Sequence, residues 1–424
     1  MVPFRSVWPP KGTALGPGDN ETAPKRVFNG DSAIASKILS MTHEPFATVL
    51  LTHYDPPPEM ARTSPSGDIP ATALGKLRNR LEEANFEVKE WNLSQDKPQP
   101  DDKDAGRAEV LLIVPPPVMP GQPGQQREPF GPNQEKKIRE AIEAGTGAIF
   151  LTGFTWPRRF TFFMPPVQPP YVFGDYLRDQ WGIDAKTNYR IIPAVADATI
   201  AGKAKINPIR FFYLPLSNFS NHPIARPLQG QRTVWSDLCP VEAVDSPPEG
   251  VEVQPLLTVP ANWTGTWASR RVVELDRKIK TEPGSLVSPD YEAGDMPIPP
   301  QGLSVAAAAV RKRPDGSTAA SIVVLGMGMS MMDGYLNAPV PRLDARGGME
   351  LTDEPSANAD VVINSAYWLA GGGLTRYIAA GPARIKPVEI IDPATRMWLW
   401  SLCVIGLPVL AAGAGGVVML VRRR

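Results

Sequence analysis

The feature that most constrains this chain is a long uncharged run near its C-terminus. Residues 397–421 read MWLWSLCVIGLPVLAAGAGGVVMLV and contain no Asp, Glu, Lys or Arg over 25 positions. An α-helix needs about 20 apolar residues to cross the hydrocarbon core of a bilayer. The flanking residues that suit a membrane interface are Trp398, Trp400, Arg422, Arg423 and Arg424. We therefore predict a transmembrane helix at 397–421, in preference to a buried core helix.

The charges around this run predict its orientation. Three arginines follow the run and Arg396 precedes it, so the positive-inside rule places the C-terminus in the cytoplasm and residues 1–396 outside it. Export needs a signal, yet the first 40 residues contain no apolar segment of that kind. Either the bulk is cytoplasmic and tail-anchored, or a membrane segment precedes residue 1. We favour the second alternative, which predicts a single-pass cell-membrane protein, as given, with an extracytoplasmic bulk.

Composition excludes several classes of protein. The chain carries 44 basic and 44 acidic residues, so its net charge is zero and no basic field favours nucleic acid. Two cysteines, Cys239 and Cys403, cannot build a disulfide framework or a cysteine zinc site. With three histidines and no GxxxxGK[ST] motif, we expect no metal and no cofactor. A hydrophobic share of 42% is typical of a globular chain, so the 48 prolines belong in connections.

The first half of the chain alternates apolar strands with amphipathic helices. Strands are predicted at 46–54, 87–93, 109–114 and 148–152, and helices at 71–84, 133–144 and 171–181. Asn85, Gly145 and Gly182 are the helix stops, and Asn133 is the N-cap of the second helix. Short apolar strands alternating with helices predict an α/β fold with a mostly parallel sheet that is covered on both faces.

The second half of the chain begins with a β-rich portion. Short β-like pieces are predicted at 189–192, 234–235, 251–257 and 271–275, buried strands at 303–311 and 321–326, and a helix at 358–370. The predicted organisation is a loop-like remnant of an upstream domain at 1–30, an α/β domain at 31–370 with its β-rich portion at 187–300, a linker at 371–396, the transmembrane helix at 397–421 and a basic cytoplasmic end at 422–424.

Two proline-rich insertions, 115–132 and 154–170, follow the carboxyl ends of predicted strands. Ligands of open parallel sheets bind at these ends. The second insertion begins FTWPRRFTFFMPP, and its candidate contacts with a partner or with lipid headgroups are Trp156, Arg158 and Arg159. Packing on its own domain is the alternative, and base stacking is disfavoured by the neutral charge. His53 and Asp55, at the end of the first strand, are candidate ligand contacts, with a purely structural role as the alternative.

The order of segments resembles the extracytoplasmic region of the gliding-motility-type ABC-transport auxiliary family. The stretches that carry the resemblance are VFNGDSAIASKILSMT (27–42), THYD (52–55), RNRLEEANFEVKEWNL (78–93), AEVLLIVPPP (108–117), EKKIREAIEAGTGAIFLT (135–152), YLRDQWGIDAKTNYRI (176–191), SNHPIARPLQGQRTVW (220–235), SIVVLG (321–326) and NADVVINSAYWLAGG (358–372), followed by the membrane helix. The resemblance implies a glutamine-amidotransferase-like or flavodoxin-like domain. It also implies an accessory role beside an ABC permease and ATPase, and an upstream membrane helix with a thioredoxin-like domain.

An amidotransferase-like fold raises the question of a catalytic nucleophile. Neither cysteine lies on a strand-to-helix turn, and no G-x-S-x-G motif occurs. The nearest candidate is Ser330, with Asp333 close by, in a GMGMS turn where relatives often carry an acidic turn. We therefore expect no catalytic residues and a non-catalytic, membrane-anchored accessory component. The alternatives are a membrane-anchored hydrolase or amidotransferase-like enzyme that uses His53, or an envelope ligand sensor.

Overall fold

The computed structural model describes part of the chain. The described residues are 43–53, 74–93, 99–100, 106–114, 132–157, 168, 170–192, 214–261, 266–281, 294–333, 335–336, 341–343, 349–351, 356–371 and 373–378. All of them belong to one compact unit, Met1–Gly381. Within these ranges, no helix has the length and apolar character that crossing a membrane requires. The predicted transmembrane helix at 397–421 lies outside the described residues.

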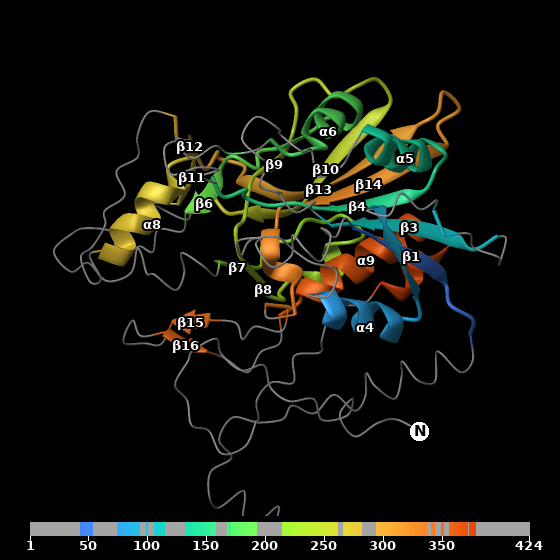
Figure 1. Ribbon diagram of the computed structural model, residues 1–424, viewed down its shortest axis with the longest axis horizontal. Coiled ribbons are helices and arrows are strands. Elements are labelled where there is room, and N and C mark those ends of the chain that lie inside the picture. The colour runs from blue at the N-terminus through green and yellow to red at the C-terminus, as the bar shows by residue number, and fades with distance from the viewer. Residues whose placement is uncertain are drawn as a thin grey trace, which may run out of the picture. The chain divides into compact units, whose positions relative to one another are not determined.

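A seven-stranded mixed sheet forms the centre of this unit (Figure 1). Its strands, in spatial order, are β10 (Val251–Val259), β13 (Leu303–Lys312), β14 (Thr318–Leu325), β4 (Gly147–Leu151), β3 (Ala108–Ile113), β1 (Ala47–His53) and β2 (Glu87–Asn92). The pairs from β14 to β2 are all parallel, whereas β10 and β13 add two antiparallel strands at one side. The predicted α/β fold with a mostly parallel sheet is confirmed.

Helices cover both faces of the sheet. Two of them, α4 (Gly75–Glu83) and α9 (Asn358–Ala370), lie on one face, and α5 (Pro132–Glu143) and α6 (Gly174–Trp181) lie on the other (Figure 1). Successive strand residues alternate between the two cores, as the pleat requires. Thus Leu51 packs with α4 and α9, and its neighbour Leu50 packs with α5 and α6. Burial on both faces explains why these strands read as continuous apolar runs.

The helix boundaries follow local sequence signals with one exception. Gly182 ends α6 with a φ of 64°, and Asn85 lies just beyond α4 with a φ of 62°, which confirms both predicted stops. The predicted N-cap Asn133 is wrong, because α5 already begins at Pro132. Proline suits the first helical position, where its missing N–H has no helical acceptor.

Short strands pair into smaller sheets. These strands are β5 (Ile183–Ala185) with β9 (Val241–Ala243), β7 (Leu214–Leu216) with β8 (Thr233–Trp235), β15 (Pro341–Leu343) with β16 (Met349–Leu351), and a three-stranded set of β6 (Arg190–Ile192), β11 (Trp267–Ser269) and β12 (Met296–Pro297). Three 3-10 turns are η3 (Arg226–Leu228), η4 (Gly328–Met331) and η5 (Leu374–Tyr377).

The predicted β-like piece at 271–275 is wrong, because α8 (Val272–Thr281) is a helix. The β-branched pair Val272 and Val273 reads as a strand, yet Val272 and Leu275 are three positions apart and both enter a small core against β6 and β11. Tertiary packing therefore overrides the local propensity of the two valines.

The beginning and the end of the described unit meet at the amino edge of the sheet. Phe46 precedes β1, and its ring stacks on that of Tyr377 in η5 at a centroid separation of 4.4 Å. Tyr367 of α9 lies near both rings and donates a hydrogen bond to the carbonyl oxygen of Ala84 (2.6 Å). We call this pair of stacked rings the aromatic clasp.

Distant side chains form hydrogen bonds with the backbone of two elements, α4 and β8, at the opposite, carboxyl edge. No side chain of the preceding residue caps α4, but Asp333 Oδ1 accepts a hydrogen bond from the Lys76 amide at 2.7 Å. A carboxylate at this position suits the positive end of the helix dipole. Asn358, the first residue of α9, donates to Val234 O and accepts from Val234 N (2.7 and 2.9 Å), so it pairs with β8 as another strand would.

Residues 236–240, which we call the crossing segment, lie across the carboxyl ends of β4 and β14. Five of its hydrogen bonds join Ser236 N to Ser330 Oγ, Phe154 N to Asp237 O, Ile191 N to Leu238 O, Cys239 N to Gly326 O and Lys186 N to Pro240 O. Phe154 lies just beyond β4 and Gly326 directly follows β14. The crossing segment therefore fills this part of the carboxyl edge with the chain's own residues.

The contact at Gly326 yields a test of this arrangement. A Cβ at this position would lie 2.5 Å from Cys239 O and 2.9 Å from Val305 O. We expect Gly326→Ala to lower the free energy of unfolding by about 1–3 kcal/mol, because neither backbone oxygen can move freely. Gly174→Ala is the control, since the nearest atom to its Cβ would be 4.0 Å away. Urea unfolding followed by circular dichroism measures both, and equal stabilities would contradict the packing.

Candidate functional site

The carboxyl edge of the parallel strands is the natural place to look for a site, because ligands of such sheets bind there. Each predicted contact that the structure describes lies at this edge: His53 ends β1, and Trp156 follows β4. Other predicted site residues lie outside the described residues; these are Asp55, Arg158, Arg159, Trp398, Trp400, Arg422, Arg423 and Arg424. Among the residues that the structure does describe, no group of three His, Cys, Asp or Glu side chains is placed to hold a metal ion.

His53 belongs to a polar group shared by β1, β2 and α4. Its side chain is 2% exposed, and Nε2 lies 3.8 Å from Glu90 Oε2. Glu90 in turn accepts a hydrogen bond from Arg78 Nη1 at 2.6 Å, and Arg78 also contacts Glu82. His53 therefore faces the edge strand β2 and the helix α4.

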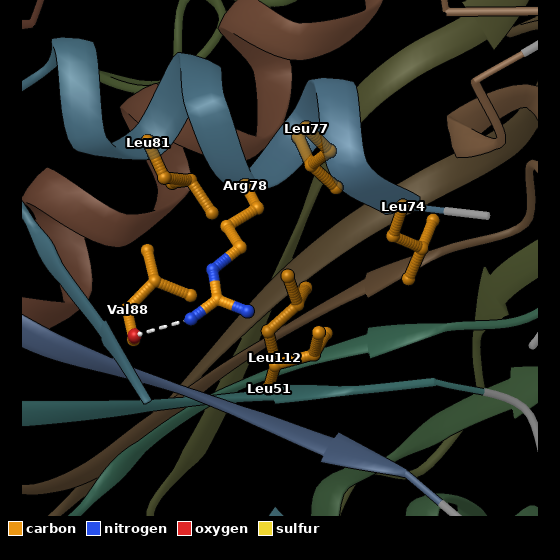
Figure 2. Close-up of a pocket in the computed structure, with 7 residues that line it drawn as sticks. All are labelled: Leu51, Leu74, Leu77, Arg78, Leu81, Val88 and Leu112. Atoms are coloured by element: carbon orange, nitrogen blue, oxygen red, sulfur yellow. Dashed lines mark hydrogen bonds between the residues drawn. The ribbon is translucent and has the colours of Figure 1, made fainter. Parts of the chain in front are cut away.

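Arg78 also borders the small space between α4 and the sheet that Figure 2 shows. Its Nη2 donates to Val88 O at 3.3 Å, drawn as the dashed line in Figure 2. The remaining lining is apolar and consists of Leu51, Leu74, Leu77, Leu81, Val88 and Leu112. This space has no room for a water molecule. It is part of the packed contact between α4 and the sheet, and Arg78 covers its outer side.

The two described candidates for a nucleophile are both engaged in packing. Ser330 is fully buried, and its hydroxyl donates to Met327 O at 2.7 Å while accepting from Ser236 N at 2.6 Å. Cys239 is fully buried as well, and burial raises the pKa of its thiol. Asp333 binds the start of α4, so it does not activate Ser330.

The spacing of the strands separates these groups from His53. Ser330 and Cys239 lie beside the end of β14, whereas His53 ends β1, and β4 and β3 stand between them. Three strand spacings of 4.7–4.9 Å amount to roughly 14 Å. A general base must come within hydrogen-bond reach of its nucleophile. His53 is therefore too far away to serve either of them.

A buried ion pair fixes Trp156 at the carboxyl end of β4. Asp237 Oδ1 accepts a hydrogen bond from the indole Nε1 of Trp156 at 3.1 Å and lies 3.4 Å from Arg190 Nε. The Arg190 guanidinium also lies over the Trp156 ring, 5.3 Å from its centroid. The Arg190 and Asp237 side chains are 1% and 8% exposed. We call these three residues the Trp156 cluster.

Within the Trp156 cluster, Asp237 has an uncommon backbone conformation and a raised carboxyl pKa. Asp237 has a φ of 50°, a left-handed conformation that is uncommon outside glycine and asparagine. Burial raises the pKa of its carboxyl group, and Arg190 and the Trp156 indole oppose that rise. Sequence reasoning singled out Trp156 but missed Arg190 and Asp237, because no local pattern brings residues 156, 190 and 237 together.

The buried pair predicts a pH-dependent loss of stability. We expect Arg190→Met to lower the free energy of unfolding by about 3–5 kcal/mol at pH 7, because it leaves a buried carboxylate without its cation. The folded-state pKa of Asp237 then rises further above its unfolded value, so the missing stability returns as the pH falls and the carboxylate takes up a proton.

Urea unfolding of the variant at pH 7 and pH 4.5 measures this effect. Arg178→Met is the control, because Arg178 forms exposed ion pairs on α6, and it should change little at either pH. A deficit of equal size at both pH values would show that Arg190 acts through packing alone.

Comparison with known proteins identifies no family for this chain. No family model matches it, and no curated protein matches it. Among solved structures, the mmIFT52 N-terminal domain is similar over 77% of this chain and 98% of its own, with 12% identity and a TM-score of 0.40. A putative ThuA-like protein from Bacteroides uniformis ATCC 8492 is similar over 77% of this chain and 93% of its own, with 12% identity and a TM-score of 0.36. Likeness at this level carries no argument about function.

Proposed function

We propose that this chain is a membrane-anchored, non-catalytic accessory component of an ABC-type transport system. Its α/β domain binds a partner or ligand at the carboxyl edge of the sheet, and the run at 397–421 anchors it in the membrane. The domain lies outside the cytoplasm, and the permease and ATPase subunits of the transporter are its partners. The basis for the transport assignment is the ordered resemblance described from the sequence.

The observation that carries the non-catalytic assignment is the crossing segment. It occupies the carboxyl ends of β4 and β14 with the chain's own backbone. Ser330 holds the segment through its hydroxyl, and Cys239 is part of it. The Ser330 hydroxyl is therefore a poor nucleophile, because attack would break the hydrogen bonds with which it holds the edge together, and the Cys239 thiol is fully buried.

The finer fold assignment, flavodoxin-like or amidotransferase-like, is also a proposal, and strand order supports it. Counted along the chain, the parallel strands β2, β1, β3, β4 and β14 stand in the order 2-1-3-4-5, which is the flavodoxin-like order. The switch point of that order lies between β1 and β3, where Val114 N donates to Thr52 O at 2.9 Å. His53 ends β1 beside this point, but its side chain is 2% exposed and faces β2 and α4. His53 and Asp55 therefore stay proposed ligand contacts on the basis of the sequence alone.

The stretches that carry the resemblance lie on elements of the central sheet. The quoted stretches coincide with β1, with α4 and β2, with β3, with α5 and β4, with β14 and with α9. These elements build the central sheet and its covering helices. A hydrolase remains the alternative, but no described residue brings a base to Ser330 or Cys239.

The anchor can be tested by deletion. Removing residues 397–424 should convert the protein from detergent-dependent to soluble, because it removes a run long enough to cross the bilayer. Removing only 422–424 is the control, which keeps the apolar run and should stay in the membrane fraction. Both are measured by sedimentation after a high-salt wash. If the longer deletion still sediments with membranes, the single-anchor proposal is wrong.

The accessory role can be tested by co-purification from membranes. The full chain, extracted in mild detergent, should bring down an ABC permease and ATPase, and mass spectrometry identifies them. The control bait carries residues 397–424 on an unrelated soluble domain, which separates binding by the α/β domain from shared residence in the membrane. The contrary result is turnover of glutamine, esters or peptides by the purified chain that His53→Ala abolishes.

A further inference from the structure

The chain leaves α9 through a run of three glycines at 371–373. Gly371 has a φ of 63° and Gly373 a φ of 79°, and glycine adopts these left-handed conformations without strain. A Cβ at either position would have no atom within 4 Å, so close packing does not require a glycine there. Hinges are commonly a few residues at the end of an element, where φ and ψ can change. Gly371 and Gly373 suit this role.

Residues 374–378, which we call the strap, follow these glycines and consist of η5 and Ile378. The hydrogen bonds of the strap are local. In the described part of the chain, each of them joins two residues of 371–378. They include Leu374 N to Gly371 O (2.9 Å), Arg376 N to Gly373 O (3.4 Å), Ile378 N to Thr375 O (3.2 Å) and Arg376 Nη2 to Tyr377 Oη (3.3 Å). The strap can therefore leave the domain without breaking a hydrogen bond to another described element.

Apolar contacts hold the strap against the domain. The Tyr377 ring stacks on that of Phe46 with centroids 4.4 Å apart and an interplanar angle of 25°, and its centroid lies 6.1 Å from that of the Tyr367 ring. Leu374 and Ile378 are half-buried and pack against the same core as Phe46. Such contacts are non-directional, and they are lost together when the two surfaces part.

The other side of the aromatic clasp is fixed by hydrogen bonds to the backbone. Phe46 N donates to Asn85 O at 2.9 Å, and the Tyr367 hydroxyl donates to Ala84 O at 2.6 Å. Separation of the stacked rings therefore leaves Phe46 and Tyr367 in place and moves the strap. Because an isolated turn is unstable in water, a released strap also loses its own hydrogen bonds.

We propose that residues 374–378 form a hinged strap with two states, docked on Phe46 or released about Gly371 and Gly373. A segment held by few buried contacts opens at a much lower free energy than the core of a domain. Release turns the strap into a continuation of the linker that follows it. The residues from 372 to 378 then add at most about 25 Å to the reach of that linker.

This inference rests on the proposed function and adds a means of regulation to it. The linker joins the α/β domain to the run at 397–421, which we propose as the membrane anchor. The effective concentration of a tethered domain at a partner in the same membrane depends on the length of its tether. The docked strap keeps the tether short, and the released strap lets the domain reach partners farther away. The binding surface itself does not change.

Hydrogen exchange of the full chain in detergent, measured by mass spectrometry, tests for the two states. We expect the amides of the strap to exchange at least about 10-fold faster than those of the central strands β3 and β4, because they open locally. Tyr377→Ala removes the ring that stacks on Phe46. It should accelerate exchange in the strap about 10-fold further, because a stacked aromatic pair contributes free energy of that order. Exchange in β3 and β4 should stay as in the parent.

Two control variants separate the ring stack from other effects. Tyr377→Phe keeps the ring and loses only the hydroxyl that accepts from Arg376, so the strap should exchange as in the parent. Thr375→Ala changes an exposed side chain of the strap and should have no effect either. Strap exchange as slow as that of β3 and β4, or an equal acceleration of all three in Tyr377→Ala, would overturn the proposal, because the strap would then be part of the core.

A distance measurement follows the movement itself. Nitroxide labels are placed at Thr375→Cys and at Lys136→Cys on α5, which are both exposed, in a chain with Cys403→Ala and the fully buried Cys239. We expect one narrow distance with a minor broad component, and Tyr377→Ala should make the broad component dominant. The control pair Lys136→Cys with Gln254→Cys should give one narrow distance in both backgrounds. An unchanged Thr375–Lys136 distance in Tyr377→Ala would contradict the hinge.

The strap and the proposed function fail separately. Exchange and label distances report on the strap whether or not the chain is anchored, whereas sedimentation after deletion of 397–424 reports on the anchor. If the protein is anchored and the strap exchanges with the core, the proposed function stands and the strap assignment fails. If the strap opens and the protein is not anchored, the proposed function fails and the regulation of the tether fails with it.

Discussion

Burial of five parallel strands on both faces is the constraint from which the other features of this structure follow. Helices α4 and α9 take one face and α5 and α6 take the other, so neither face of the parallel part is left for a partner. A partner or ligand that contacts the sheet itself can then reach only its edges and the segments that join its strands. At the carboxyl edge, the crossing segment already covers β4 and β14, which leaves the β1–β3 switch point.

Long-range polar contacts complete the carboxyl edge. Asp333 binds the start of α4, Asn358 pairs with β8, and Ser330 holds Ser236. Each side chain accepts a hydrogen bond from a backbone N–H in a distant part of the chain. A buried N–H group that lacks an acceptor lowers the stability of the fold. These three residues therefore stabilise the joints between elements, which is a sufficient reason for their polar side chains at this edge.

Elements whose local pattern agrees with their final packing could be predicted from the sequence. The helix at 358–370 was predicted with the bounds that α9 has, and the four early strands were placed to within a residue or two. The prediction at 271–275 was wrong because two adjacent valines favour a strand, whereas packing of Val272 and Leu275 against β6 and β11 selects a helix. Of the candidate site, His53 and Trp156 were found because each follows a recognisable strand. Arg190 and Asp237 were not, since only the folded chain brings them to Trp156.

The aromatic clasp has a mechanical consequence. The chain enters the described unit beside Phe46 and leaves it beside Tyr377, and these two rings are stacked on one another. Tension applied between Phe46 and Tyr377 therefore acts across this stack at the amino edge. The Phe46 amide also donates to Asn85 O at 2.9 Å, so the ring stack and this backbone hydrogen bond share the load.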